Sequence, residues 1–128
     1  GRRPRLGWIV DAQEDFLRPP EAGGRLYVRH LDDPRDIGAV QILPRLAETV
    51  AWLGAAAVAR VFTGDMHRDE DPEIDRDAPD FVHTFPAHCM GLGRDPAERR
   101  GAALVNEVAP AGPWAVLPRD ASSAAAQR

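Results

Sequence analysis

The chain has 128 residues and a formal net charge of −4, with 44% hydrophobic and 28% charged residues. This composition is typical of one globular domain and excludes a disordered or fibrous chain. All sixteen basic residues are arginines, scattered among twenty acidic residues. No basic stripe therefore favours a nucleic acid partner, and no lysine is available as a general acid or Schiff base.

The single cysteine, Cys89, excludes an intrachain disulfide and is in keeping with a reducing compartment. No apolar run reaches the roughly 18–20 residues that a membrane span requires. We therefore expect a single domain over residues 1–128, located in the cytoplasm, with neither a membrane nor a nucleic acid as partner.

Two apolar runs predict strands, at residues 6–10 (LGWIV) and 57–64 (AVARVFTG). Continuous apolar runs are typical of strands buried on both faces of a parallel sheet. Between them, apolar side chains recur at helical spacing from Asp36 to Leu53, with Pro44 in an early turn or at a kink, and Gly54 as a stop. Strand, helix and strand within about sixty residues predict a βαβ unit.

The remaining segments are predicted as follows: residues 66–80 as a long acidic loop, 97–108 as a short helix, 114–117 as a third strand, and 120–128 as a tail that begins with a helix cap at Asp120 or Ser122. An open α/β sheet of three strands leaves an edge unpaired. We expect this edge to be completed by a partner, such as a second copy of the chain, or by the rest of a longer polypeptide.

Two carboxylates follow the predicted parallel strands directly, Asp11 after the first and Asp65 after the second. Open α/β sheets bind ligands outside the carboxyl ends of their strands. Asp11 follows three apolar residues, so partial removal from water would suit it to proton transfer. Position alone leaves an equal alternative, in which the carboxylate caps the next helix or turn.

A metal site is suggested by Asp65 and His67, because alternate residues of an extended segment point the same way. A catalytic site with an open position needs a third ligand. His88 is the leading candidate, while His30 and His83 are more typical of surface histidines. The alternative for the Asp-x-His pair is a solvated turn.

Cys89 stands next to His88, which suggests a nucleophile with an activating base. Adjacent residues of an extended segment face opposite sides, so that pair is poorly placed for the necessary hydrogen bond. A buried structural thiol is the favoured interpretation.

Four segments together resemble the nicotinamidase-like members of the isochorismatase-like hydrolase superfamily. Residues 9–16 (IVDAQEDF) resemble the family's opening Val-Asp-x-Gln-x-Asp-Phe, and residues 23–28 (GGRLYV) its Gly-Gly-x-Leu-x-Val. Residues 63–67 (TGDMH) resemble its Thr-x-Asp-x-His, and residues 85–90 (FPAHCM) its Trp/Phe-Pro-x-His-Cys-Val. The resemblance covers most of the chain, from about Gly7 to Val108.

The resemblance implies a three-layer, doubly wound parallel α/β sheet and hydrolysis of a small amide, from nicotinamide to nicotinate and ammonia in the namesake enzyme. It implies that Asp11 is the acid/base and that Phe16 helps to line the ring pocket, although Phe16 also suits a plain core position. It further implies a divalent metal, usually zinc, held by a set of three ligands: Asp65, His67 and His88.

Two features depart from the family pattern. The family's catalytic lysine is replaced, in a loose alignment, by Arg119, which keeps the positive charge but cannot readily give up a proton. The family's nucleophilic cysteine belongs to a later strand, and the chain ends before that strand. We therefore expect the fold to be incomplete at the C-terminus, and Cys89 is not the family nucleophile. Two alternatives remain: a non-catalytic metal- or ligand-binding module, and a metal-independent relative that acts on another amide or a vinyl ether.

Overall fold

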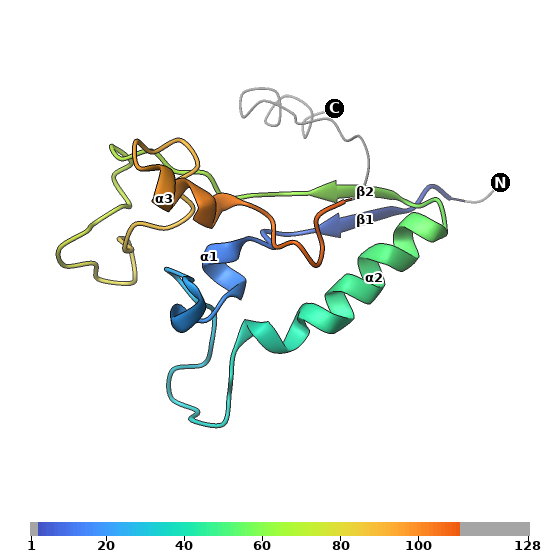
Figure 1. Ribbon diagram of the computed structural model, residues 1–128, viewed down its shortest axis with the longest axis horizontal. Coiled ribbons are helices and arrows are strands. Elements are labelled where there is room, and N and C mark those ends of the chain that lie inside the picture. Colours follow the sequence, from blue (N-terminus) through green and yellow to red (C-terminus); the bar gives the residue numbers. More distant parts are fainter. Residues whose placement is uncertain (1–2, 111–128) are drawn as a thin grey trace.

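The computed structural model describes residues 3–110, in which two parallel strands and one long helix form a βαβ unit. Strand β1 (Leu6–Ile9) pairs in parallel with strand β2 (Ala59–Phe62), and helix α2 (Leu43–Ala55) connects them. Figure 1 shows α2 running along one face of the strand pair. The predicted βαβ unit is therefore confirmed. The predicted third strand at 114–117, the tail at 120–128 and Arg119 lie outside the described residues.

The core lies between α2 and the strand pair. The alternation along β1 points Ile9 toward α2, where Val50 and Leu43 are buried. Later parts of the chain complete this core; its buried members are Ile9, Ala12, Leu17, Leu43, Val50, Val105 and Val108. Burial of this apolar surface is the main contribution that holds the helix on the sheet.

The opposite face of β1 is exposed, in contrast to the expected burial on both faces. Trp8 keeps 67% of its surface accessible, and Leu6 is exposed on the same face. The reason is that the described residues cover only the face on which α2 packs. The three-layer, doubly wound sheet stays a prediction.

Helix α2 begins later than the periodicity predicts. Gly38 adopts a positive φ of 85°, and a 3₁₀ turn (Ala39–Ile42) precedes the helix. Pro44 lies in the first helical turn, where a backbone N–H would have no acceptor within the helix, so its absence costs no hydrogen bond. Regular α-helical hydrogen bonding therefore begins at Leu43, and the helix ends at Ala55, one residue beyond the predicted stop at Gly54.

The predicted helix over residues 97–108 is wrong in its second half. Helix α3 (Pro96–Arg99), capped by Asp95, continues only as a 3₁₀ turn (Arg100–Ala102). Beyond that turn the chain leaves the helical path to bond with the segment after β1: the N–H of Glu14 donates to the carbonyl of Ala103, and the N–H of Val105 donates to that of Ala12. These long-range hydrogen bonds override the local helical preference.

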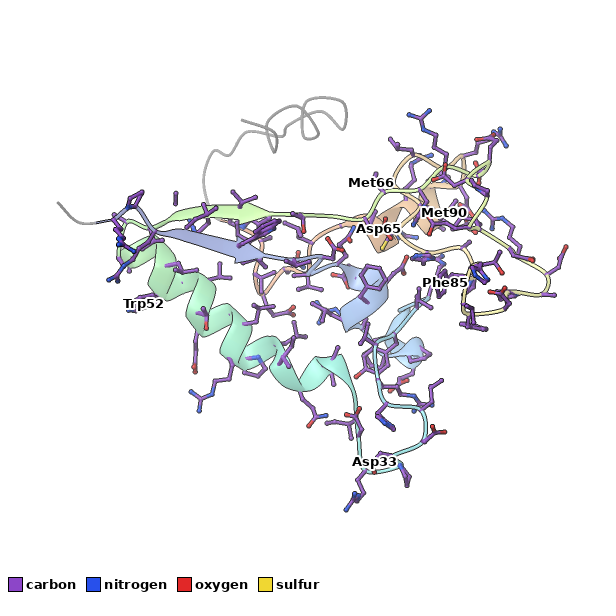
Figure 2. All side chains as sticks on the ribbon, turned by 180° about the vertical axis from the view of Figure 1, so that it is seen from behind. Asp33, Trp52, Asp65, Met66, Phe85 and Met90 are labelled. Carbon is purple, nitrogen blue, oxygen red and sulfur yellow. The ribbon has the colours of Figure 1, made fainter. Side chains whose placement is uncertain are left out.

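Helix α1 (Glu14–Leu17), helix α3 and the long loops gather at the carboxyl end of the strand pair, as Figure 1 shows. In Figure 2, Asp65, Phe85 and Met90 lie together at this end, while Trp52 of α2 lies at the other. Across residues 3–110, no helix has both the length and the apolar character that crossing a membrane requires.

Candidate metal centre

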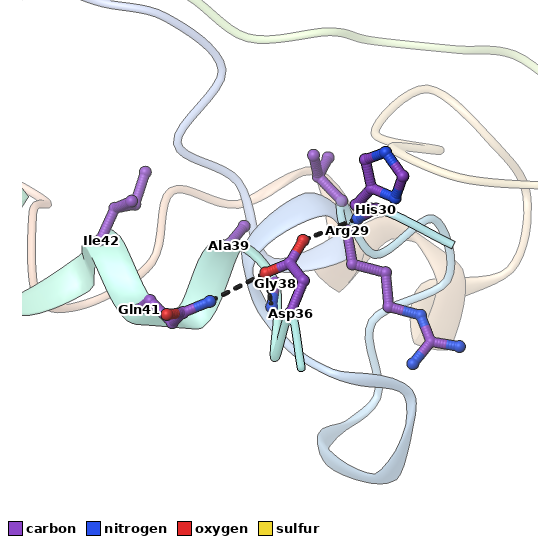
Figure 3. Close-up of a pocket in the computed structure, with 8 residues that line it drawn as sticks. Arg29, His30, Asp36, Gly38, Ala39, Gln41 and Ile42 are labelled. Atoms are coloured by element: carbon purple, nitrogen blue, oxygen red, sulfur yellow. Dashed lines mark hydrogen bonds between the residues drawn. The ribbon is translucent and has the colours of Figure 1, made fainter. Parts of the chain in front are cut away.

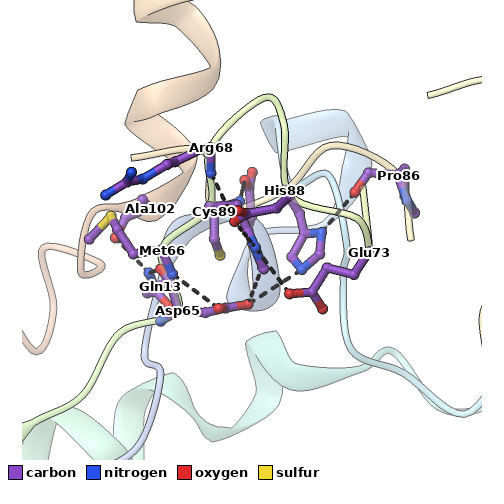
Figure 4. Close-up of polar contacts among 12 residues, drawn as sticks. Gln13, Asp65, Met66, Arg68, Glu73, Pro86, His88, Cys89 and Ala102 are labelled. Atoms are coloured by element: carbon purple, nitrogen blue, oxygen red, sulfur yellow. Dashed lines mark hydrogen bonds and ion pairs between the residues drawn. The ribbon is translucent and has the colours of Figure 1, made fainter. Parts of the chain in front are cut away.

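The three residues predicted as ligands meet at the carboxyl end of the strands. Oδ2 of Asp65 lies 2.8 Å from Nε2 of His67 and 3.4 Å from Nε2 of His88. One potential ligand atom from each residue lies within 4.8 Å of the other two. Both imidazoles are buried, whereas the side chain of Asp65 keeps 34% of its surface accessible. The cluster, of which Figure 4 labels Asp65 and His88, is therefore buried on the histidine side and accessible at the carboxylate.

The second nitrogen of each histidine already has a partner. Nδ1 of His88 lies 2.7 Å from the carbonyl oxygen of Pro86. Nδ1 of His67 lies 3.1 Å from Asp71 and 3.3 Å from Glu73. Nε2 of both rings faces Asp65. With an ion between these groups, the acceptors at Nδ1 would hold the ring proton there and leave the Nε2 lone pair for the ion.

Electrostatics in the cluster favour a positive charge at its centre. The neighbouring His88, together with His67, lowers the pKa of the Asp65 carboxyl to about 2. Burial lowers the pKa of His88, but contacts with Asp65 and with the Pro86 carbonyl outweigh it and raise that pKa above its usual value. The carboxylate is thus held ionised, and the adjacent Glu73 adds further negative charge.

Asp65 is held in place by Gln13, whose side chain is fully buried. Oε1 of Gln13 accepts the N–H of Asp65 at 2.8 Å, and Nε2 donates to the carbonyl of Asp65 at 2.8 Å. The third hydrogen bond of this side chain runs from Nε2 to the carbonyl of Ala102 and is also 2.8 Å long. The side-chain amide therefore pairs with the chain after β2 as a neighbouring strand would.

His88 is positioned through the next residue, Cys89. The carboxylate of Asp15, which has no accessible surface, accepts the N–H of Cys89 at 2.7 Å and the N–H of Arg25 at 3.2 Å. Sequence reasoning assigned no role to Gln13 or Asp15. The one signal available in the sequence is that both are polar residues shortly after an apolar strand.

Asp11, the predicted acid/base, is half-buried at the end of β1. The hydroxyl of Thr63 donates to its Oδ1 at 2.8 Å, and its backbone has a positive φ of 49°. Among the described residues, Asp11 takes no part in the contacts of Asp65 with His67 and with His88. It stands instead two residues before Gln13, at the same end of the sheet.

Phe16, the predicted pocket residue, lies beside the cluster. Its ring centroid is 5.7 Å from that of His88, with the planes tilted by 54°. Phe85 contacts His88 as well, in an edge-to-face arrangement with the centroids 6.0 Å apart. Two phenyl rings therefore flank one of the candidate ligands, a feature that the sequence indicated only for Phe16.

The other two histidines are not part of the cluster. His83 is exposed, 3.5 Å from Asp80. His30 lines an open depression of about 430 Å³, which is formed by residues between 28 and 42, just before α2 in the chain, and is shown in Figure 3. There the carboxylate of Asp36 accepts the N–H groups of His30 and Gly38 and the side-chain amide of Gln41, so its oxygens are used within the loop.

Cys89 is completely buried, with a left-handed backbone at φ 47°. Burial, reinforced by the charge of Asp15, raises the pKa of its thiol. Such a thiol is a poor nucleophile because the reactive species is the thiolate. This geometry favours the structural role over the catalytic one.

The donor set suits a divalent transition metal. Two imidazole nitrogens and one carboxylate oxygen are a known catalytic zinc combination, which leaves a position for water or substrate. The acceptors behind both histidines are the supporting contacts that such ligands usually have. Asp65, His67 and His88 would hold the ion, and the exposed side of Asp65 would leave it accessible.

Comparisons with protein-family models, curated proteins and solved structures find no match to this chain.

Proposed function

We propose that this chain carries the metal-binding and acid/base part of a nicotinamidase-like amide hydrolase. The observation that supports the proposal most directly is the convergence of His67 Nε2, His88 Nε2 and Asp65 Oδ2, with both Nδ1 atoms already bonded. The four motifs in family order add to it. We take zinc as the metal, and a three-layer, doubly wound sheet as the complete fold.

The reaction in the proposal breaks the C–N bond of a small amide such as nicotinamide. Asp11 takes the proton of a cysteine thiol, and the thiolate sulfur adds to the carbonyl carbon. Asp11 then returns the proton to the departing nitrogen, which leaves as ammonia. Water hydrolyses the thioester to the acid and restores the thiol. The metal, when bound, would hold the pyridine nitrogen, and Phe16 would lie along the ring.

The nucleophile in this scheme is not among these 128 residues. Cys89 is the only cysteine of the sequence, and its burial and raised pKa argue against attack on a substrate. Arg119 could stabilise a developing negative charge on the amide oxygen but could not act as an acid. The proposal therefore requires a cysteine from elsewhere in the working enzyme.

A second candidate is a metal- or ligand-binding module without catalysis. The specific observation in its favour is the same buried Cys89. The described residues bring the three candidate ligands together, but they offer no reactive thiol. This candidate retains zinc and a pyridine ligand but forms no product.

Ammonia release from nicotinamide separates the two candidates. The polypeptide is purified intact from its source and assayed as prepared, after chelation, and after restoration of Zn²⁺. The hydrolase proposal expects ammonia release that falls on chelation and returns with zinc. Bound zinc without ammonia release would favour the binding module, and release that is unaffected by complete metal removal would contradict the metal-dependent mechanism.

A further inference from the structure

Two buried polar side chains lie behind the metal ligands and belong to neither the ligand set nor the proposed chemistry. We propose that Gln13 and Asp15 are positioning residues, which fix the ligands at their separation before any metal binds. This inference rests on the proposed metal site. It assigns to the segment after β1 the role of setting the affinity of that site.

Gln13 acts on the loop that carries Asp65. The parallel register of the strands continues beyond their ends, because the N–H of Thr63 donates to the carbonyl of Ile9 and the N–H of Asp11 donates to that of Thr63. The next hydrogen bonds to this loop come from the side chain of Gln13, which both donates to and accepts from Asp65. The backbone of Asp65 is thereby held on both sides.

Asp15 acts on the loop that carries His88. Its carboxylate is fully buried, and its nearest cation, the Arg25 guanidinium, is as far as 3.8 Å away. Burial of an ionised group is costly unless hydrogen bonds compensate. Here the shortest of these comes from the N–H of Cys89 at 2.7 Å, so the compensation itself fixes the residue next to His88.

The packing around Asp15 leaves little freedom for it to move. A Cβ placed on Gly101 would lie 1.9 Å from Oδ2 of Asp15, so the carboxylate occupies the space that any other residue would need. The 3₁₀ turn that contains Gly101 also supplies the Ala102 carbonyl to Gln13. Both positioning residues are thus anchored against the same turn.

The two ligand-bearing loops are also bonded to each other. The N–H of His67 donates to the carbonyl of Cys89 at 2.8 Å, and the N–H of Leu92 donates to the carbonyl of His67 at 3.0 Å. Gln13, which bonds to the loop of Asp65, and Asp15, which bonds to the loop of His88, therefore hold the two joined loops in a closed frame. The ligands need no rearrangement from a disordered state to reach their separation.

The test compares metal binding by the full chain with that of two size-matched variants. Gln13→Met keeps the volume and removes three hydrogen bonds, while Asp15→Asn keeps the size and removes the charge. Val50→Ala, a core change in α2 away from both loops, serves as the control for general destabilisation. Each protein is titrated with Zn²⁺ and with Co²⁺, whose visible absorption depends on coordination geometry.

We expect both variants to bind each metal about 10- to 100-fold more weakly, with an altered Co²⁺ spectrum, while Val50→Ala keeps the wild-type affinity and spectrum. Wild-type affinity and spectrum in folded Gln13→Met and Asp15→Asn would overturn the inference. If one variant does not fold, the other decides by the same criterion. If the wild type binds neither metal, the proposed site itself fails, which is a distinct result.

Amide exchange in the metal-free wild type gives a test without variants. The N–H groups of Asp65 and Cys89, which donate to Gln13 and Asp15, should exchange slowly before any metal is added. Fast exchange that becomes slow only with Zn²⁺ would mean that the metal orders the loops, and it would overturn the inference.

Discussion

At the scale of single residues, the cluster depends on which nitrogen of each histidine is engaged elsewhere. Pro86 supplies a carbonyl to His88, and Asp71 and Glu73 supply carboxylates to His67, so the same nitrogen, Nε2, faces Asp65 in both. An imidazole with a free choice of tautomer would present a ligand nitrogen only part of the time. One backbone carbonyl and two side-chain carboxylates around the cluster therefore determine which nitrogen of each histidine is turned toward Asp65.

The burial of Cys89 leads to a prediction about its reactivity. Because the thiol has no accessible surface and a raised pKa, a disulfide reagent such as DTNB should fail to label the folded protein at pH 8. The same reagent should label one thiol per chain in guanidinium chloride. Rapid stoichiometric labelling of the folded protein would contradict the structural role and revive the nucleophile interpretation.

At the scale of elements, the loop that leads to His88 is organised by one carboxylate. Asp80 accepts the backbone N–H groups of Thr84, Val82 and His83 at 2.8, 2.8 and 2.7 Å. These hydrogen bonds hold the pKa of Asp80 well below its usual value. A carboxyl whose pKa is lowered in the folded state stabilises the loop above its unfolded pKa of 3.8 and loses that contribution as the pH falls through the folded value.

The amide proton shifts of residues 82–84 should therefore show no transition from the Asp80 carboxyl between pH 7 and about pH 4, and this transition should come only at lower pH. Asp80→Ala should shift these three amide signals at neutral pH and speed their hydrogen exchange, while the amides of α2 stay unchanged. NMR spectra of both proteins provide the measurement. A midpoint at or above 3.8 for the titration of the Asp80 carboxyl in the wild type would contradict this account of the loop.

The elements also indicate how far the sequence can predict this fold. The two strands and α2 are visible as apolar runs and helical periodicity, because burial against one neighbour leaves a local pattern. The end of α3 leaves no such pattern, since the chain after Ala102 turns away to bond with Ala12 and Glu14, far along the sequence. The exposed face of β1 was equally unpredictable, because an apolar run does not reveal which face is covered.

The candidate site divides in the same way. Asp65, His67 and His88 could be predicted because ligand chemistry restricts the residue types and an Asp-x-His spacing points two of them together. The parts played by Gln13 and Asp15 could not, because their hydrogen bonds join residues 52 and 74 positions apart. A buried glutamine and a buried aspartate follow an apolar strand in many sequences, and only the folded arrangement identifies what they hold.

At the scale of the whole molecule, the strands, α1 and the loops meet at one end of the sheet, and the ligands, Asp11 and Phe16 all belong to that end. This placement agrees with the general location of ligand sites in open α/β sheets. The cluster lies at the carboxyl end of the βαβ unit, where the long acidic loop of residues 66–80 adds negative charge. A dication would be attracted there, and attraction through the field of the whole protein weakens as salt increases.

The most direct test of the central claim is an equilibrium titration of the metal-free chain with Zn²⁺, in which calorimetry measures the binding. Wild-type protein should bind one zinc ion per chain, and His67→Gln and His88→Gln should each weaken binding at least about 100-fold by removing a direct ligand. His30→Gln, the same substitution at a histidine outside the cluster, should bind as the wild type does. Absence of zinc binding by the wild type, or equal binding by all four proteins, would contradict the assignment of Asp65, His67 and His88 as a metal centre.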